Sequence, residues 1–330
     1  MGYGEFITPT GPRLSRRVDL KIAGGVRLGP SNQVGAWLAQ GLSKHLAKDS
    51  TFTMTAGGGD PLVKVTEGKA DLCYSTMQGA RSAYLGSAEE KPLNGLRAIC
   101  TLHKRDWYQF TVPISLGVNS VEELIEKRKP IKLAIPPGKS PSGVLEIGHS
   151  MFKAYGIDPR EIESWGGKLL TGFSSRPHEH VRRVLLGEAD CIFEDGVATT
   201  HWWELFATRE MKILPLKDEA IALVNKEMGN LGTIIPRGWY HGKVPDREIR
   251  TIDASNWMVL VSEKMDDELA NLLTKCAVEY KAEFEAEFNM LPLERSSLTY
   301  PLFPTYMARD TSVIPLHPGA ERYYREKCYL

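Results

Sequence analysis

Histidine and acidic side chains gather in the middle of the chain, and these residue types are suited to chemistry. His178 and His180 stand two positions apart, Glu194-Asp195 follow an apolar run, and His201 comes soon after. Imidazole and carboxylate groups can together move a proton or hold a metal ion. Positions i and i+2 of a helix do not share a face, so His178 and His180 would not both point into one metal site. We therefore expect no metal, and proton transfer by His180, Glu194 or Asp195 stays as an alternative.

Three glycine-rich turns form a second group, and their chemistry suits an anion. They cover 24–32, 57–61 and 137–143, each between the end of an expected strand and the start of an expected helix. Free amides and the positive end of the helix dipole attract negative charge there. Arg27 follows the first turn, and its planar guanidinium can pair with a carboxylate through two hydrogen bonds. An ordinary salt bridge is the other reading of Arg27, and the same two readings apply to Arg176.

The elements that would position these residues alternate between strand and helix. In the first hundred residues the polar and apolar patterns predict strands at 18–25, 51–59 and 70–75, with helices at 32–48 and 60–68. A second series of the same kind has strands at 131–135, within 163–173 and at 189–193, with helices at 144–155 and 178–186. This alternation predicts parallel sheets covered by helices, in which the turns at the strands' carboxyl ends border the ligand crevice.

The order of elements predicts an α/β fold with two lobes, each a mostly parallel sheet flanked by helices. We expect two linking strands, with crossings near Val112 and Leu214. These crossings place 1–112 and 217–330 in lobe 1 and 113–216 in lobe 2. A length of 330 residues agrees with this division, since one hydrophobic core seldom serves more than roughly 250–300 residues.

Three further segments bear on this plan. A Gly-x-Ala-Asp sequence occurs once in each series, at 68–71 and at 187–190, which suggests that the lobes share a plan. A long amphipathic helix is expected from 266 to about 288, and the tail 313–326 is typical of a Pro-braced loop that runs into a short closing helix.

Composition and motifs exclude several classes of protein. Lys+Arg and Asp+Glu both number 41, and a net charge of zero argues against a nucleic-acid partner. No run of about 18 apolar residues exists for insertion into a membrane. Neither a nucleotide-binding glycine motif nor a Gly-x-Ser-x-Gly elbow is present, so we expect no cofactor and find no support for covalent catalysis.

The expected compartment depends on the start of the chain. The first residues lack the apolar core of a secretory signal, and the five cysteines are scattered, as in a reducing environment. We expect a cytoplasmic protein if Met1 is the native start, and a periplasmic one if an export signal was removed.

Six segments, in this order, resemble the TAXI family, the solute-binding proteins of TRAP-type transporters. They are Ala23-Gly-Gly25, Ala56-Gly-Gly-Gly-Asp60, Gly68-Lys-Ala-Asp71, Ile135-Pro-Pro-Gly-Lys-Ser-Pro-Ser-Gly143, Ile235-Pro-Arg-Gly-Trp-Tyr-His-Gly242 and Pro315-Leu-His-Pro-Gly-Ala-Glu-Arg-Tyr-Tyr-Arg-Glu326. The last segment is the most specific, and the resemblance runs from about Lys21 to the end of the chain.

The resemblance implies a type II periplasmic-binding fold that closes by a hinge around a small carboxylate such as glutamate. TRAP-type membrane subunits are the implied partners if the chain is exported. Together with the glycine turns, the resemblance places the ligand against the following residues: Gly25, Arg27, Ser31, Asn32, Gly58, Gly59, Asp60, Thr76, Gln78, Ser140, Ser142, Gly143, Arg176, Glu194 and Asp195.

One departure from the family concerns the ligand. The family usually has a Tyr-Tyr-Pro-x-Gly run after its first glycine turn, where this chain has Val26-Arg-Leu-Gly-Pro30, so an arginine replaces an aromatic wall. Since some enzymes use the same fold, the alternative function is a cytoplasmic decarboxylase or lyase that acts on a small carboxylic acid, aromatic acids included. In that enzyme His180, Glu194 or Asp195 would transfer the proton.

Overall fold

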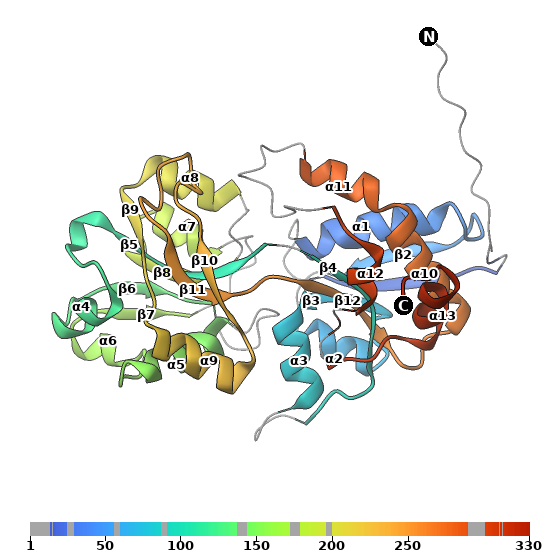
Figure 1. Ribbon diagram of the computed structural model, residues 1–330, viewed down its shortest axis with the longest axis horizontal. Coiled ribbons are helices and arrows are strands. Elements are labelled where there is room, and N and C mark those ends of the chain that lie inside the picture. Colours follow the sequence, from blue (N-terminus) through green and yellow to red (C-terminus); the bar gives the residue numbers. More distant parts are fainter. Residues whose placement is uncertain are drawn as a thin grey trace, which may run out of the picture.

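The structure is a computed structural model of residues 1–330. It describes Leu14, 16–24, 30–55, 60–86, 91–103, 105–136, 144–171, 179–195, 200–289, 301–309, Thr311 and 313–330. For 30–32, 200 and 287–289 only the backbone is described. Two lobes lie side by side, each built on one sheet (Figure 1).

Lobe 1 is built on a sheet of five strands in the order β2-β1-β3-β12-β4. Strand β1 pairs in parallel with β2 and β3, whereas β12 runs antiparallel to both β3 and β4. The strands are β1 (Asp19–Ala23), β2 (Thr51–Thr55), β3 (Leu72–Thr76), β4 (Leu96–Leu102) and β12 (Trp257–Ser262).

Lobe 2 has a sheet of seven strands in the order β10-β11-β5-β8-β6-β7, with β9 paired to β5. Strand β6 is parallel to β7 and β8, and β5 is antiparallel to β8, β9 and β11. The strands are β5 (Trp107–Pro113), β6 (Lys132–Ala134), β7 (Lys168–Leu170), β8 (Cys191–Glu194), β9 (Met211–Leu214), β10 (Gly232–Ile235) and β11 (Ile249–Asp253). The predicted two-lobed α/β fold is confirmed, but the sheets are mixed and not mostly parallel, because β12 in lobe 1 and β5 in lobe 2 pair antiparallel with their neighbours.

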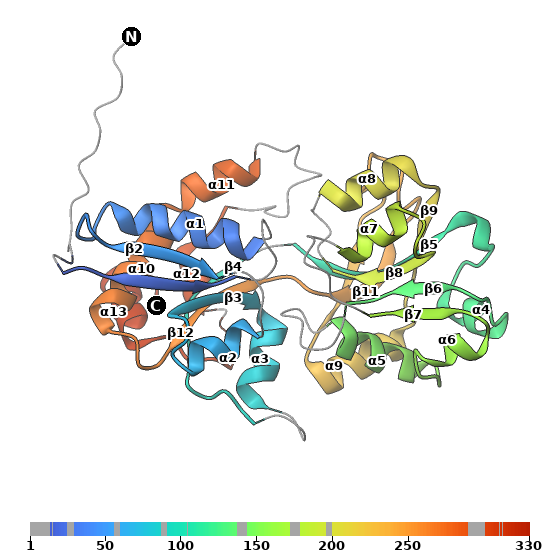
Figure 2. The ribbon, with the colours of Figure 1, turned by 180° about the vertical axis from the view of Figure 1, so that it is seen from behind.

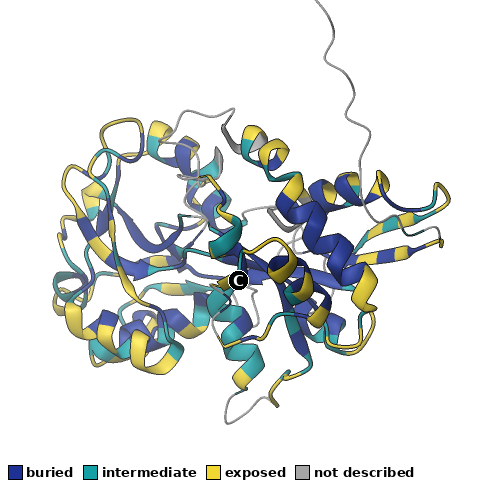
Figure 3. Cartoon of the chain, turned by 45° about the vertical axis from the view of Figure 1, so that its right-hand side comes forward, coloured by how far each residue is buried: buried dark blue, intermediate teal, exposed yellow. Residues whose placement is uncertain are grey.

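Helices cover both faces of the sheet in lobe 1, and strands β3, β12 and β4 beneath them are largely buried (Figure 3). One core lies under α1, α10, α12 and α13, and a second lies under α2 and α3. The helices of this lobe are α1 (Pro30–Ser43), α2 (Pro61–Thr66), α3 (Met77–Leu85), α10 (Asp267–Glu279), α11 (Lys281–Asn289), α12 (Pro304–Arg309) and α13 (Pro318–Glu326).

Lobe 2 repeats the sandwich. Helices α4, α5, α6 and α9 enclose one core, and α7 and α8 enclose the other (Figure 2). The helical segments are η1 (Ile114–Leu116), α4 (Val121–Glu126), α5 (Val144–Ala154), α6 (Glu161–Ser164), α7 (Glu179–Leu185), α8 (Thr200–Thr208) and α9 (Asp218–Met228).

The sheets divide at different positions from the predicted crossings. Strand β5 pairs only within the second sheet, and β10 and β11 extend that sheet at its other side. The connections between sheets are therefore the segments after β4, at 103–106, and after β11, at 254–256. The predicted boundaries at 112 and 217 assigned β5, α9, β10 and β11 to lobe 1, because the sequence pattern does not reveal their pairing.

The two connections are hydrogen-bonded to each other. The Ala254 amide donates to the Asp106 carbonyl (3.1 Å), and the Ser255 hydroxyl donates to the same oxygen (3.0 Å). The Asp106 amide in turn donates to Ser255 Oγ (3.1 Å). Because both covalent links meet in this seam, a change in its backbone angles would rotate one lobe relative to the other.

The predicted long helix is interrupted at Tyr280. Helix α10 ends at Glu279 and α11 starts at Lys281. The Trp37 indole N–H donates to the Tyr280 carbonyl (2.9 Å), and the Tyr280 hydroxyl contacts His45 Nε2 at 2.9 Å. The break is therefore held by contacts with α1 and the turn after it, which periodicity alone does not reveal.

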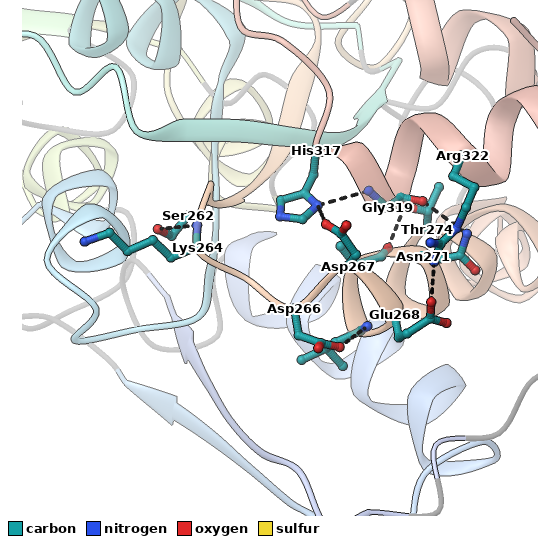
Figure 4. Close-up of polar contacts among 12 residues, drawn as sticks. Ser262, Lys264, Asp266, Asp267, Glu268, Asn271, Thr274, His317, Gly319 and Arg322 are labelled. Atoms are coloured by element: carbon teal, nitrogen blue, oxygen red, sulfur yellow. Dashed lines mark hydrogen bonds and ion pairs between the residues drawn. The ribbon is translucent and has the colours of Figure 1, made fainter.

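The tail of the chain packs against helix α10 of lobe 1 (Figure 4). His317 caps α13, its Nδ1 accepting from the Gly319 amide at 3.2 Å. A Cβ on Gly319 would lie 2.1 Å from the Asp267 carbonyl oxygen, so only glycine lets α13 approach α10 this closely. Asn271 donates to the Gly319 carbonyl, and Arg322 pairs with Glu268. The Pro-braced loop and closing helix are thus as predicted.

Candidate functional site

The candidate site consists of the carboxyl ends of β3 and β8, which lie beside the connections between the lobes. Thr76, the last residue of β3, is in register with Trp257, the first residue after the connection 254–256. Glu194, the last residue of β8, is opposite Gln109, which comes soon after the connection 103–106. Topology therefore brings one strand end from each lobe to the same seam.

On the lobe 1 side, two of the predicted ligand residues act as helix caps. The Thr76 hydroxyl accepts from the Gly79 amide (3.0 Å) at the start of α3, and the Asp60 carboxylate accepts from the Leu62 amide (2.8 Å) at the start of α2. Asp60 thus supplies its own negative charge to the amino end of α2, where the turn 57–61 was expected to receive an anion.

Gln78 differs from these two capping residues. It stands in the first turn of α3, and its Oε1 atom is buried without a hydrogen-bond partner among the described residues. A buried amide oxygen that makes no hydrogen bond costs free energy, so such an atom calls for a ligand or a water molecule. The predicted site residue Gln78 is therefore a polar group available at the end of β3.

On the lobe 2 side, Glu194 and His180 lie next to each other. His180 Nδ1 is 3.9 Å from Glu194 Oε1, which exceeds hydrogen-bonding distance. The side chains are 4% and 15% exposed, and Glu194 Oε2 is buried with no hydrogen-bond partner in the part of the chain that the structure describes. Burial, and then the nearby Asp195 and Asp106 carboxylates, raise the pKa of Glu194 well above its ordinary value.

The raised pKa determines what Glu194 can offer to a ligand. A protonated carboxyl donates one hydrogen bond, which an anion could accept without meeting a negative charge on Glu194 itself. Asp195 is buried beside it, and its backbone carbonyl accepts from the Trp202 indole N–H at 3.0 Å. Trp202 is fully buried and Trp203 nearly so, and both pack in the core under α7 and α8.

Residues that were not selected from the sequence lie beside Glu194 in the structure. Gln109 is fully buried in β5, and its Nε2 donates to the Tyr240 hydroxyl at 3.0 Å. The Trp107 indole N–H donates to Gln109 Oε1 at 3.3 Å. The signal in the sequence was a glutamine within the aromatic run 107–110, since a buried amide in a strand needs partners.

Several predicted site residues fall outside the described part of the chain. These are Gly25, Arg27, Gly58, Gly59, Ser140, Ser142, Gly143 and Arg176, and also His178. Ser31 and Asn32 lie in the first turn of α1, where only the backbone is described. Their roles as ligand residues stay predictions.

The two Gly-x-Ala-Asp segments have the same structural role in both lobes. Gly68 and Gly187 follow α2 and α7 with φ of 71° and 76°. Asp71 Oδ2 accepts from the Lys21 amide (2.7 Å), and Asp190 Oδ2 accepts from the Lys132 amide (2.9 Å). Each aspartate fixes the start of one strand, β3 or β8, against its parallel neighbour, β1 or β6, so this repeat is architectural.

A pocket of about 340 Å³ opens elsewhere, at the opposite edge of the sheet in lobe 1. Its lining includes Val65, Asp71, Lys264 and Leu269, which lie at the amino end of β3 and near the start of α10. Figure 4 shows Ser262, Lys264 and Asp266 at this edge. This pocket lies at the amino end of β3, so it is remote from Thr76 and Gln78 at the carboxyl end.

Among the described residues, no cluster of three or more histidine, cysteine or acidic side chains is suited to hold a metal ion. None of the helices described is both long enough and apolar enough to cross a membrane.

Solved structures with the same fold are periplasmic binding proteins. A periplasmic transporter protein is 13% identical, with a TM-score of 0.51 and coverage of 94% of this chain and 96% of its own. The binding protein of an ABC phosphonate transporter from Pseudomonas aeruginosa is 12% identical, with a TM-score of 0.50 over 79% of this chain and 74% of its own. A protein from Bordetella bronchiseptica RB50 is 10% identical, with a TM-score of 0.51 over 94% and 98%.

These likenesses show the two-lobed fold of periplasmic binding proteins. No curated protein sequence matches the chain. The model of one protein family, however, matches residues 27–328, nearly the whole length. The chain therefore belongs to the NMT1-like family.

Proposed function

We propose that the protein reversibly binds a small organic anion between its two lobes. The observation that carries this proposal is the pair of buried polar atoms without partners, Gln78 Oε1 and Glu194 Oε2, at strand ends of opposite lobes. A molecule between the lobes would supply partners to both, and its negative charge would suit a protonated Glu194. Each lobe would then provide half of the site.

A carboxylate is the ligand class that we propose. The glycine turns after β1 and β6, with Arg27 and Arg176, are the predicted partners of its charged group. The phosphonate transporter's binding protein, named above, has the same fold, so phosphonates are the natural competing class for a test. We further propose that the protein is a receptor of the TAXI type that works with TRAP-type membrane subunits if it is exported, or a cytoplasmic derivative of such a receptor.

The test is native mass spectrometry with a panel of glutamate, succinate and methylphosphonate. We expect one carboxylate to add to the wild-type protein in a ratio of one to one. Gln78→Ala and Glu194→Ala should each weaken that adduct. Gln40→Ala and Glu210→Ala serve as matched controls, since these side chains are exposed on lobes 1 and 2. Addition of methylphosphonate alone would refute the carboxylate class.

A second candidate function is a decarboxylase or lyase, and the raised pKa of Glu194 beside His180 favours it. A carboxyl group whose pKa is raised by burial holds its proton to a higher pH than an ordinary glutamate does, and it can act as a general acid there. Carbon dioxide release or loss of the added carboxylate during incubation would establish this function, and recovery of the compound unchanged would exclude turnover of it.

A further inference from the structure

Helix α3 of lobe 1 reaches across to helix α9 of lobe 2. Arg81, in the middle of α3, donates from Nη1 to the carbonyl oxygen of Met228, the last residue of α9, at 3.4 Å. A cation is stabilised at this position, because the carboxyl end of a helix carries partial negative charge. The contact therefore joins the lobes through a favourable but long hydrogen bond.

Gly229 makes room for the arginine. It ends α9 in the left-handed conformation, with φ of 80°. A Cβ at this position would lie 2.3 Å from Arg81 Nη1 and 3.0 Å from Cζ. Because glycine has no side chain, it can adopt this left-handed conformation and also leave space for the guanidinium group.

Both helices are also tied to the seam between the lobes. The Met77 amide at the start of α3 donates to the Asn256 carbonyl (3.0 Å) in the connection after β11. Beyond α9, Asn230 Nδ2 donates to the Asp253 carbonyl (2.9 Å) at the other end of the same connection. Together with these two hydrogen bonds, the Arg81 contact completes a ring of contacts around this connection. Rotation of the lobes would have to break the Arg81 contact.

We propose that Arg81 is a latch between the lobes. Its hydrogen bond holds α3 against the end of α9 and must break before the lobes rotate apart. The proposal concerns the lobes alone and does not depend on the ligand. The long hydrogen bond suits a contact that forms and breaks repeatedly, since a rigid joint would require shorter and more numerous bonds.

Lobe 2 contains a matched control for this contact. Arg209 Nη2 donates to the carbonyl of Leu185, the last residue of α7, at 2.7 Å, and both residues belong to the same lobe. Gly187 has φ of 76°, as Gly229 has 80°, but a Cβ on Gly187 would stand 3.6 Å from Arg209 Nη2. The Arg209 contact is thus of the same chemical kind as the Arg81 contact but lies within one lobe, with a shorter hydrogen bond and more room at its glycine.

The experiment measures the distance between the lobes by double electron–electron resonance. Spin labels are placed at Lys48→Cys in lobe 1 and Glu126→Cys in lobe 2, with Cys328→Ser to remove the exposed native thiol. We expect Arg81→Met to broaden the distance distribution and shift it from that of the parent protein. Arg209→Met should leave the distribution unchanged.

A second pair of variants tests the same latch without removing the arginine. Gly229→Ala should displace Arg81 and shift the distribution in the same direction as Arg81→Met, whereas Gly187→Ala should not. Far-ultraviolet circular dichroism of each variant checks that it is folded. Distributions that stay at the parental position in both Arg81→Met and Gly229→Ala would overturn the proposal, as would an equal shift in the Arg209→Met control.

Discussion

The two lobes share a scaffold but differ in the chemistry at their strand ends. In both, three parallel strands are followed by equivalent helices, and Asp71 and Asp190 hold the same hydrogen bond to a neighbouring strand. At the end of β3 lobe 1 presents the neutral Thr76 and Gln78, whereas at the end of β8 lobe 2 presents Glu194 and Asp195. The repeated residues build the frame, and the residues that differ are those next to the seam.

A second difference between the lobes is the additional layer on lobe 1. Helix α13 packs on α10, and the Tyr324 hydroxyl donates to the Ile99 carbonyl at 3.1 Å. This layer returns the chain's end to the lobe in which it began. The tail segment that most resembles a known receptor family thus packs against the rest of lobe 1.

The largest expected effect on stability comes from replacing one glycine in each lobe at which backbone atoms leave no room for a Cβ. A Cβ on Gly319 would meet the Asp267 carbonyl at 2.1 Å, and one on Gly167 would meet the Ile131 carbonyl at 2.4 Å. We expect Gly319→Ala and Gly167→Ala each to lower the free energy of unfolding by about 3 kcal/mol, measured by urea denaturation.

Gly95→Ala is the control, because its Cβ would meet only the Glu263 side chain, at 3.6 Å. If both lobes unfold as one unit, the two damaging variants will shift a single transition. Two separate transitions would show that the lobes are independent, and a loss in Gly95→Ala as large as in the others would contradict the steric explanation.

A smaller effect tests whether the shared scaffold is energetically equivalent. Asp71→Ala and Asp190→Ala each remove an acceptor for a strand amide, and we expect each to cost about 1 kcal/mol in urea denaturation. Aspartate to asparagine at the same positions keeps an acceptor oxygen and should cost less. A loss at one position and none at the other would mean that the two Gly-x-Ala-Asp segments do not have the same role.

The smallest effects concern pH, and the lobes should respond in opposite senses. Burial raises the pKa of Glu194 in lobe 2, so the folded state holds a proton that the unfolded state releases. The protein should therefore lose stability as pH rises above about 4.5, the ordinary glutamate value, toward the raised pKa. Glu194→Gln should flatten this part of the stability profile, and an unchanged profile would contradict a buried, protonated Glu194.

In lobe 1 burial lowers the pKa of His317, the cap of α13. The unfolded state then binds a proton more readily, and stability should fall as pH decreases below about 6.5, the ordinary histidine value. His317→Asn keeps a capping side chain and removes the titration, so its stability should vary less in this range. A variant with the same acid dependence as the parent would assign that dependence to other groups.

Local patterns predicted most of the elements, but not which strands pair. The strands and helices of the two alternating series were found because each follows its own periodicity, and Gly156 ends α5 as expected, with φ of 80°. Strands β10 and β11 were missed, and so the second connection was placed before α9 instead of after Asp253. Their position depends on antiparallel pairing with β5, which is a long-range contact.

The site was predictable only in part for a related reason. The end of a strand is a local feature, so Glu194 and Asp195 could be selected from the pattern of residues, whereas Thr76 and Gln78 came from the resemblance to the TAXI family. Whether a side-chain atom has a hydrogen-bond partner depends on the folded structure. The Asp60 carboxylate accepts a hydrogen bond from its own helix, whereas Gln78 Oε1 accepts none from any described residue. The hydrogen bond of Gln109 with Tyr240 joins β5 to a residue far along the chain, so the sequence marks Gln109 within an aromatic run but not its partner.

The central claim is that one small anion touches both lobes at Gln78 and Glu194, and its most direct test is the pH dependence of binding. Affinity for the carboxylate found by native mass spectrometry would be measured by isothermal titration calorimetry from about pH 5 to about pH 8. We predict that wild-type affinity falls as Glu194 ionises, that Glu194→Gln removes this fall, and that Gln78→Ala weakens binding at every pH. Wild-type and Glu194→Gln affinities with the same pH dependence, together with unchanged binding by Gln78→Ala, would contradict the claim.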